Sequence, residues 1–204
     1  MQITWLFFDI GSTLIDETEA YNHRIRDVIA DTDITFEEFD RMRIRFARQG
    51  LEGNSAAIKH YGLTKTPWHT EDEIPYPNAC AVAESLCQKG YRLGIIANQS
   101  RGAAERLERW GLRRYFDVIA SSAELGYAKP DQRLFELALT LADCAPQQSV
   151  MIGDRLDNDM LPAKALGMTT VWIKNGLARY QPDTLGEGIV DHRVESLSDL
   201  LNIF

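Results

Sequence analysis

The sequence is short of cysteine and has no long apolar run. Among its 204 residues are three cysteines, Cys80, Cys87 and Cys144, an odd number without the spacing of a disulfide framework or a zinc site. Buried apolar thiols are the favoured interpretation. The apolar start has no basic leader or cleavage site, and no run reaches the roughly 20 residues of a membrane span. We therefore expect a cytoplasmic protein.

Positive charge is also in short supply. The chain has 22 Lys and Arg against 30 Asp and Glu, which gives a net charge of −8 and a pI near 5.0. Duplex nucleic acid and anionic membranes would be repelled on average, so we expect neither as a partner. A small anionic substrate remains compatible if a local positive group or a metal ion offsets this field. The length suits one core domain with a small insert.

Short apolar runs alternate with helical patterns along most of the chain. This alternation predicts βαβ units, and hence an α/β protein with a Rossmann-like parallel sheet. The predicted strands are Ile3 to Ile10, Leu93 to Ala97, Asp117 to Ala120, Ser149 to Ile152 and Thr170 to Ile173. The predicted helices run from a cap at Ser100 to Gly111, from about Asp131 to Leu141, from after Asp159 to Gly167, and from a capping box at Ser196 to Asp199.

Residues 16–74 break this rhythm, because they are polar and helical and contain no buried-strand run. Thr35 and Glu38 have the spacing of a capping box, and Phe39, Met42 and Phe46 then follow on one helical face. We predict a small helical cap at 16–74, inserted into a core made of residues 1–15 and 75–204.

Polar groups follow four of the predicted strands. They are Asp9 with Gly11, Asn98 with Gln99, Lys129, and Asp154 with Asp159. Ligands of open α/β sheets bind at the carboxyl ends of the strands, so these groups are expected to converge. Mg²⁺ takes one or two carboxylates together with substrate phosphate oxygens and water. The pattern therefore predicts a Mg²⁺-dependent phosphate site.

Three segments resemble motifs of the haloacid dehalogenase-like superfamily: Phe7–Leu14, Lys129-Pro130, and Gly153-Asp154 followed by Asp159 after four intervening residues. Their order and spacing match, and the likeness spans essentially the whole core. The insert resembles the helical cap that this family places after its first strand, although about 60 residues is short for one.

The resemblance implies a role for each matching position. Asp9 would be the nucleophile, and Asp9, Asp154 and the Gly11 carbonyl would hold Mg²⁺. Lys129 would neutralise the transferred phosphoryl group, and Asp159 would orient Lys129 or a metal-bound water. The phosphate-binding positions would be Ile10, Gly11, Asn98, Gln99 and Lys129, the first four through backbone N–H groups.

Two positions depart from the family's pattern. Most of its phosphatases have a second aspartate two residues after the nucleophile, where it acts as acid and base, but this chain has Gly11. General acid–base help is worth about 10²–10⁴-fold in rate. We therefore expect Gly11→Asp to raise activity on poor leaving groups. The second departure is Ala97, which stands where the family places Ser or Thr to bind phosphate.

Three functions are compatible with this pattern. The first is a phosphatase of small phosphorylated metabolites with good leaving groups, or with an acid supplied by the cap or the substrate. The second is another chemistry of the same family; its dehalogenases also lack the second aspartate, but Gly153-Asp154 speaks against that branch. The third is a metal-binding or phosphate-binding protein with a regulatory role. We expect a monomer or a homodimer.

The predicted cap holds further candidates. His23, His60 or His69 could be a substitute acid, although a surface or packing role is favoured. Trp68 with His69 is the cap segment expected to touch substrate. The arginines between Arg41 and Arg48 are interpreted as a solvated helix face rather than a substrate site.

Overall fold

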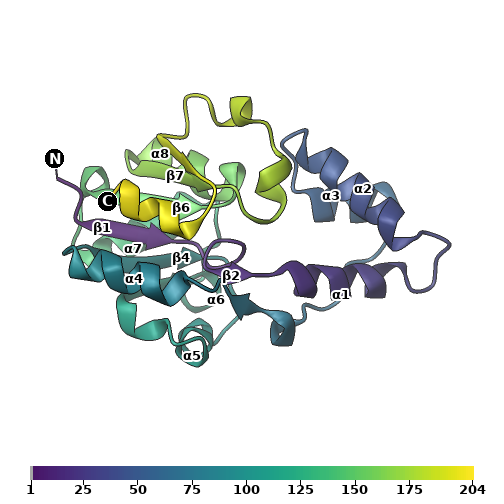
Figure 1. The fold of residues 1–204 in the computed structure, drawn as a ribbon, viewed down its shortest axis with the longest axis horizontal. Coiled ribbons are helices and arrows are strands. Elements are labelled where there is room, and N and C mark those ends of the chain that lie inside the picture. Colours follow the sequence, from purple (N-terminus) through teal and green to yellow (C-terminus); the bar gives the residue numbers. More distant parts are fainter. Residues whose placement is uncertain (1) are drawn as a thin grey trace.

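The computed structural model describes residues 2–204, and a parallel sheet forms its centre (Figure 1). The strand order is β5-β4-β1-β6-β7-β8, and every neighbouring pair is parallel. The predicted α/β class is confirmed, whereas the short, largely exposed edge strand β8 is not among the predicted strands. The bounds are β1 Trp5–Phe8, β4 Arg92–Ala97, β5 Phe116–Ser121, β6 Ser149–Gly153, β7 Thr169–Ile173 and β8 His192–Val194.

Helices bury both faces of this sheet. Successive side chains of β1 point to opposite faces, so Leu6 and Phe8 join one apolar cluster while Trp5 and Phe7 join the other. The first cluster contains α4, α5 and η7, and the second contains α7 and α8. The helices are α4 Ala79–Gln88, α5 Ala103–Arg109, α6 Ser122–Leu125, α7 Gln132–Ala142 and α8 Leu161–Leu166, with 3₁₀ turns at Arg113–Tyr115, Pro146–Gln148, Gly176–Tyr180, Asp183–Gly186 and η7 Leu197–Asn202.

Residues 16–74 form a separate helical layer beside the sheet, to the right in Figure 1. Phe39 is buried there in an apolar cluster of its own, and the predicted capping box of Thr35 and Glu38 begins α2. The two ends of this layer meet where β2, Ile15–Asp16, pairs antiparallel with β3, Ile74–Pro75. These contacts support the cap boundary that we propose. Its helices are α1 Thr18–Ile29, α2 Phe36–Ala47, α3 Gly53–His60 and the 3₁₀ turn η1 Thr70–Asp72.

Two helix starts differ from expectation. Ser100 does not cap α5, which begins after Gly102 in a left-handed conformation with φ of 85°. The reason is Arg106, whose guanidinium binds the Ser100 and Arg101 carbonyls at 2.8 and 2.9 Å and so satisfies the loop without a helical turn. The helix that ends at Gly167 begins three residues before Asp159, in a π-helical turn over Leu156–Met160.

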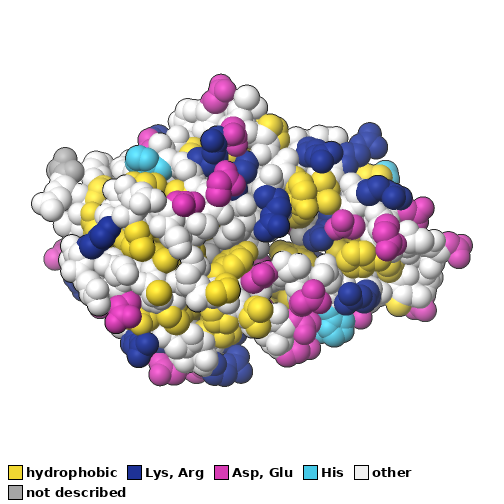
Figure 2. Space-filling model, in the orientation of Figure 1, with side chains coloured by type: hydrophobic (Ala, Val, Ile, Leu, Met, Phe, Trp, Pro, Cys, Tyr) yellow, Lys and Arg dark blue, Asp and Glu magenta, His cyan; other side chains and the backbone are white. Residues whose placement is uncertain are grey.

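The surface carries charges of both signs. Figure 2 shows acidic and basic side chains interspersed on the face viewed, together with a narrow hollow where the helical layer meets the core. Between residues 2 and 204, none of the helices combines the length and the apolar character needed to cross a bilayer.

Candidate active site

Asp9 after β1, Lys129 in the loop after α6 and Asp159 after β6 form one buried ion-pair network. Lys129 Nζ lies 2.8 Å from Asp9 Oδ1 and 2.6 Å from Asp159 Oδ1. The side chains of Lys129 and Asp159 are 2% and 0% exposed, whereas Asp9 is 14% exposed and remains accessible. Asp9 is thus the most exposed of the three side chains and the one that a ligand can reach readily.

The π-helical turn explains how Asp159 reaches this network. It brings the Asp159 carboxylate back against the end of β6, where Oδ2 accepts the Arg155 N–H at 3.0 Å. A Cβ at Gly153 would lie 2.3 Å from Asp159 Oδ2, so only glycine leaves room for this approach. The Gly153-Asp154 step and Asp159 are therefore coupled sterically.

The charges in this network shift one another's titration. Burial lowers the pKa of Lys129, but Asp159 and Asp9 outweigh that effect and the net shift is upward. Burial raises the pKa of Asp159 to about 6 against the opposing effect of Lys129. Burial, followed by the nearby Asp159 and Asp9 charges, raises the pKa of Asp154 well above its usual range. One lysine is not enough to balance three carboxylates.

These carboxylates fit a divalent cation. Asp9, Asp154 and Asp159 each offer an oxygen, and the three oxygens lie within 4.8 Å of one another. Hard oxygen ligands with excess negative charge suit Mg²⁺. The Trp172 indole N–H donates to the backbone carbonyl of Asp154 at 2.8 Å and so fixes the main chain there. This bond does not use the Asp154 carboxylate, which stays available to a cation. The expectation of Mg²⁺ is compatible with this donor set.

Asn98 and Gln99 lie at the site, but their contacts differ from those expected. Asn98 Nδ2 donates to the Lys129 carbonyl at 2.9 Å, and Lys129 N–H donates to Asn98 Oδ1 at 2.7 Å, so Asn98 holds the lysine loop in place. The Gln99 N–H already donates to Ser122 Oγ at 3.1 Å. A phosphate oxygen would have to replace this hydroxyl, and the phosphate contact of the Gln99 N–H stays a prediction.

A cavity of about 140 Å³ opens over Asp9. A second cavity of about 470 Å³ adjoins it on the cap side, and Glu17, Tyr21, Asn98 and Gln99 line both. The smaller cavity is lined by Asp9, Gly11, Ser12, Glu17, Tyr21, Asn98, Gln99, Lys129, Asp154, Arg155 and Asn158, so it gathers every predicted site position except Ile10 and Asp159, which are buried behind it.

Glu17 is the site residue that sequence reasoning missed. It precedes α1, yet its carboxyl turns back over Gly11, where a built Cβ would lie 2.5 and 2.7 Å from its two oxygens. Ser12, which has a φ of 51°, donates its hydroxyl to Glu17 Oε2 at 3.0 Å. Burial and then the Asp9 charge raise the pKa of Glu17 to about 8, against the effect of Ser12. An acidic residue eight positions after Asp9 has no motif that could have identified it.

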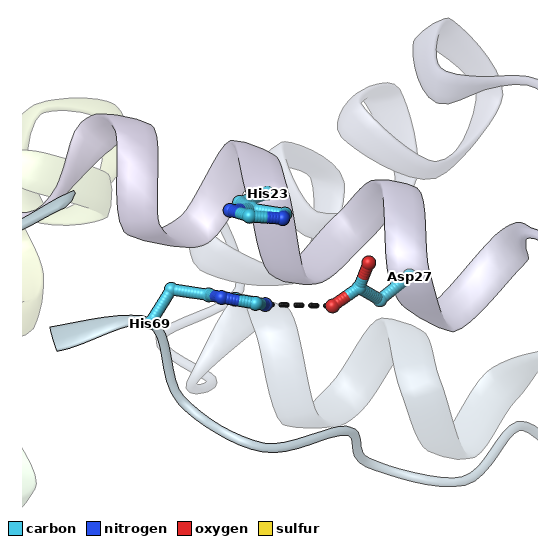
Figure 3. A group of neighbouring side chains, drawn as sticks. All are labelled: His23, Asp27 and His69. Carbon is cyan, nitrogen blue, oxygen red and sulfur yellow. Dashed lines mark hydrogen bonds and ion pairs between the residues drawn. The ribbon is translucent and has the colours of Figure 1, made fainter. Parts of the chain in front are cut away.

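The histidines of the proposed cap do not line the cavity over Asp9. His23 and His69 stack with ring centroids 3.5 Å apart and an interplanar angle of 8°, and Asp27 lies beside them (Figure 3). Ring-nitrogen lone pairs lie in the ring plane, so two parallel rings do not aim at a common ion. Instead, His69 Nε2 meets Asp27 at 2.6 Å and Nδ1 meets Glu71 at 3.1 Å. This cluster ties α1 to the segment that leads back to the core.

The His69 contacts predict a pH-dependent contribution to stability. Hydrogen bonds that the His69 ring donates to the Asp27 and Glu71 carboxylates raise the pKa of His69 above its unfolded value of about 6.5. A histidine whose pKa is higher in the folded protein contributes its full stabilisation at pH values below the unfolded pKa. That contribution to the free energy of unfolding is lost as the pH rises through the folded pKa. We expect His69→Gln to lower the Tm at about pH 5.5 and to matter progressively less toward about pH 9, as measured by thermal denaturation.

His60→Gln is the control for this prediction, because the His60 ring packs on Phe46 and Tyr61. The Tm loss of His69→Gln should exceed that of His60→Gln at about pH 5.5 and should approach it toward about pH 9. A His69→Gln difference that is independent of pH would contradict the ion-pair interpretation.

Comparisons with known proteins agree with this geometry. A family model described as haloacid dehalogenase-like hydrolase matches residues 6–173. A glyceraldehyde 3-phosphate phosphatase of Methanothermobacter thermautotrophicus is 35% identical, over 97% of this chain and 98% of its own length. A phosphoserine phosphatase of Thermus thermophilus is 33% identical over 69% of this chain and 58% of its own length.

A solved structure, a HAD phosphatase of Thermococcus onnurineus, has the same fold. Its TM-score is 0.66 with 24% identity, and the match covers 100% of this chain and 97% of that one. The family model and the full-length relative confirm the resemblance predicted from the three motifs. The chain therefore belongs to the haloacid dehalogenase-like hydrolases.

Proposed function

We propose that this protein is a Mg²⁺-dependent phosphatase of small phosphorylated metabolites, with Asp9 as the nucleophile. The observation that carries the proposal is the position of Asp9, which is accessible and lies 2.8 Å from the buried Lys129 ammonium. A carboxylate fixed by a buried cation at the mouth of a cavity is suited to attack phosphorus and to form an aspartyl-phosphate. The phosphatase names of the relatives support the same reaction class.

In this proposal, the residues around Asp9 bind and orient the phosphoryl group. Lys129 neutralises charge on the transferred group, and Asn98 keeps the Lys129 loop in position through its paired hydrogen bonds. Asp159 fixes the lysine at 2.6 Å. Asp9, Asp154 and the Gly11 carbonyl would hold Mg²⁺, and the ion, when bound, supplies further neutralisation of the phosphate oxygens.

The 470 Å³ cavity on the cap side is proposed to hold the leaving group. That volume lies in the range of small-molecule sites. It is lined by Arg24 and Lys65, which suit an anionic or polar group, and by Trp68, whose indole N–H donates to Glu73 Oε1 at 2.7 Å. Trp68 lines this cavity, which supports the predicted contact of its segment with substrate, whereas His69 does not line it.

The first experiment measures phosphate release from a panel of phosphate monoesters, with Mg²⁺ and with a chelator. The proposal expects release from three-carbon phosphate esters and similar small metabolites that depends on Mg²⁺. Halide release from a 2-haloacid without added metal would instead favour the dehalogenase chemistry. If Mg²⁺ binds but the whole panel is inert, the regulatory alternative replaces the enzyme.

The cytoplasm stays the proposed location, and the three unpaired cysteines suit a reducing compartment. Monomer or homodimer stays a prediction.

A further inference from the structure

We propose that Glu17 supplies the acid and base that the side chain at position 11 lacks. This inference rests on the proposed phosphatase function and adds a catalytic residue to it. Its starting point is steric: the Glu17 carboxyl occupies the space that a side chain on Gly11 would enter, with oxygens 2.5 and 2.7 Å from the built Cβ.

The backbone of Gly11 does not explain why this position is glycine. Gly11 is not among the glycines with positive φ, and the left-handed residue of this loop is Ser12 at φ 51°. An L-residue could therefore adopt the Gly11 backbone. A side chain at 11 would instead have to displace the Glu17 carboxyl, so glycine at this position leaves the carboxyl its place beside the backbone of residue 11.

The Glu17 carboxyl is held in place and faces the reacting groups. Ser12 Oγ donates to Glu17 Oε2 at 3.0 Å, which orients the carboxyl without closing it off. Glu17 is half-buried, and it lines the cavity over Asp9 as well as the larger cavity proposed for the leaving group. It therefore lies at the boundary between the two cavities, where the bond to the leaving group would break.

The proposed reaction has two steps. Asp9 Oδ attacks phosphorus, the bond from phosphorus to the leaving oxygen breaks, and that oxygen takes its proton from the Glu17 carboxyl. The resulting Glu17 carboxylate then accepts a proton from water as the water oxygen attacks phosphorus. The bond from phosphorus to Asp9 breaks, which releases inorganic phosphate and restores the Asp9 carboxylate and the protonated Glu17.

The same contact changes the expectation for Gly11→Asp. An aspartate at 11 would push the Glu17 carboxyl out of its place rather than enter open space, so the single variant exchanges one acid for another and should not gain activity. Shortening Glu17 at the same time removes this conflict and leaves a single carboxyl, on residue 11. The double variant Gly11→Asp/Glu17→Ala is therefore the informative one.

The experiment compares an aryl phosphate, which needs little protonation of its leaving group, with a primary alkyl phosphate, which needs much. For Glu17→Gln, kcat/KM on the alkyl ester should fall by about 10²–10⁴-fold. On the aryl ester, kcat/KM should change less than about tenfold, because it reports only the first step. The aryl reaction should also show a burst of about one equivalent of phenol before slow turnover, since water attack has lost its base.

Glu19→Gln is the matched control, an exposed glutamate two positions away in the first turn of α1, and it should behave as wild type. Thermal denaturation checks that each variant is folded. In the double variant, alkyl kcat/KM should exceed that of Glu17→Ala by at least about tenfold.

Equal losses on both esters, or an unchanged alkyl kcat/KM in Glu17→Gln, would overturn the role of Glu17. A folded double variant no faster than Glu17→Ala would overturn the positional argument. Both results presuppose an active wild type; a wild type without Mg²⁺-dependent turnover would instead refute the proposed function itself.

Discussion

Replacing Asp9 by asparagine is expected to lower Mg²⁺-dependent phosphate release by about 10⁴-fold or more, because the variant has no carboxylate to form the aspartyl-phosphate. Asparagine keeps the shape of the side chain and can still accept a hydrogen bond from Lys129, which lies 2.8 Å from Asp9. The loss should therefore occur in kcat and kcat/KM of a folded protein. Steady-state phosphate release on the most active ester measures it.

Asp117→Asn provides the control for this loss. Asp117 lies in β5 and forms an exposed ion pair with Arg92, with Nε and Oδ2 3.0 Å apart. This substitution makes the same chemical change away from the cavity, so turnover should stay at the wild-type rate. If Asp9→Asn kept wild-type turnover, Asp9 would not be the nucleophile, and any measured release would come from other chemistry or a contaminant.

The largest effect on stability is expected from Lys129→Met. Lys129 lies against Asp159, which is fully buried, and removal of one partner of a buried ion pair costs about 3–5 kcal/mol. For a chain of this size, each kcal/mol shifts the Tm by about 2–4 °C, so we expect a decrease of about 6–20 °C in the presence of a chelator. Calorimetry or thermal denaturation by circular dichroism measures this change.

The loss should become smaller toward acid pH, because a protonated Asp159 no longer needs a cation. Burial has already raised the pKa of Asp159 to about 6, and loss of Lys129 removes the group that opposes that rise. Lys164→Met is the matched control, since its partner Asp191 is about one-third exposed and surface pairs contribute at most about 1 kcal/mol. Similar Tm losses in both variants would contradict the buried network.

The sequence was informative for functional residues that come directly after buried strands. Asp9 and Asp154 come directly after apolar runs whose length identifies them as strands, and parallel strands direct their carboxyl ends to one edge. Lys129 follows the strand Phe116–Ser121 only after several further residues, so the strand pattern alone placed it less directly than the family resemblance did. The order of the three motifs along the chain identified the fold and the family, because each motif follows a strand of the sheet in the expected sequence.

The missed features depend on contacts between segments. The edge strand β8 is only three residues long and largely exposed, so its pattern does not differ from that of a loop. The start of α5 depends on a guanidinium that returns from Arg106 to the loop before the helix. Glu17 lies beside Gly11 and lines the cavity over Asp9 because the chain folds back between β1 and β2, which residue spacing cannot reveal.

The contact between Gly11 and Glu17 also restricts how this site could change over generations. Because one carboxyl occupies the space of the other, a lineage that acquired aspartate at position 11 first would place two acidic groups in one volume. A lineage that lost Glu17 first would pass through a form with no acidic side chain at either position. We therefore expect the two positions to change together, so that a chain with aspartate at 11 carries a small residue, or a differently directed one, at 17.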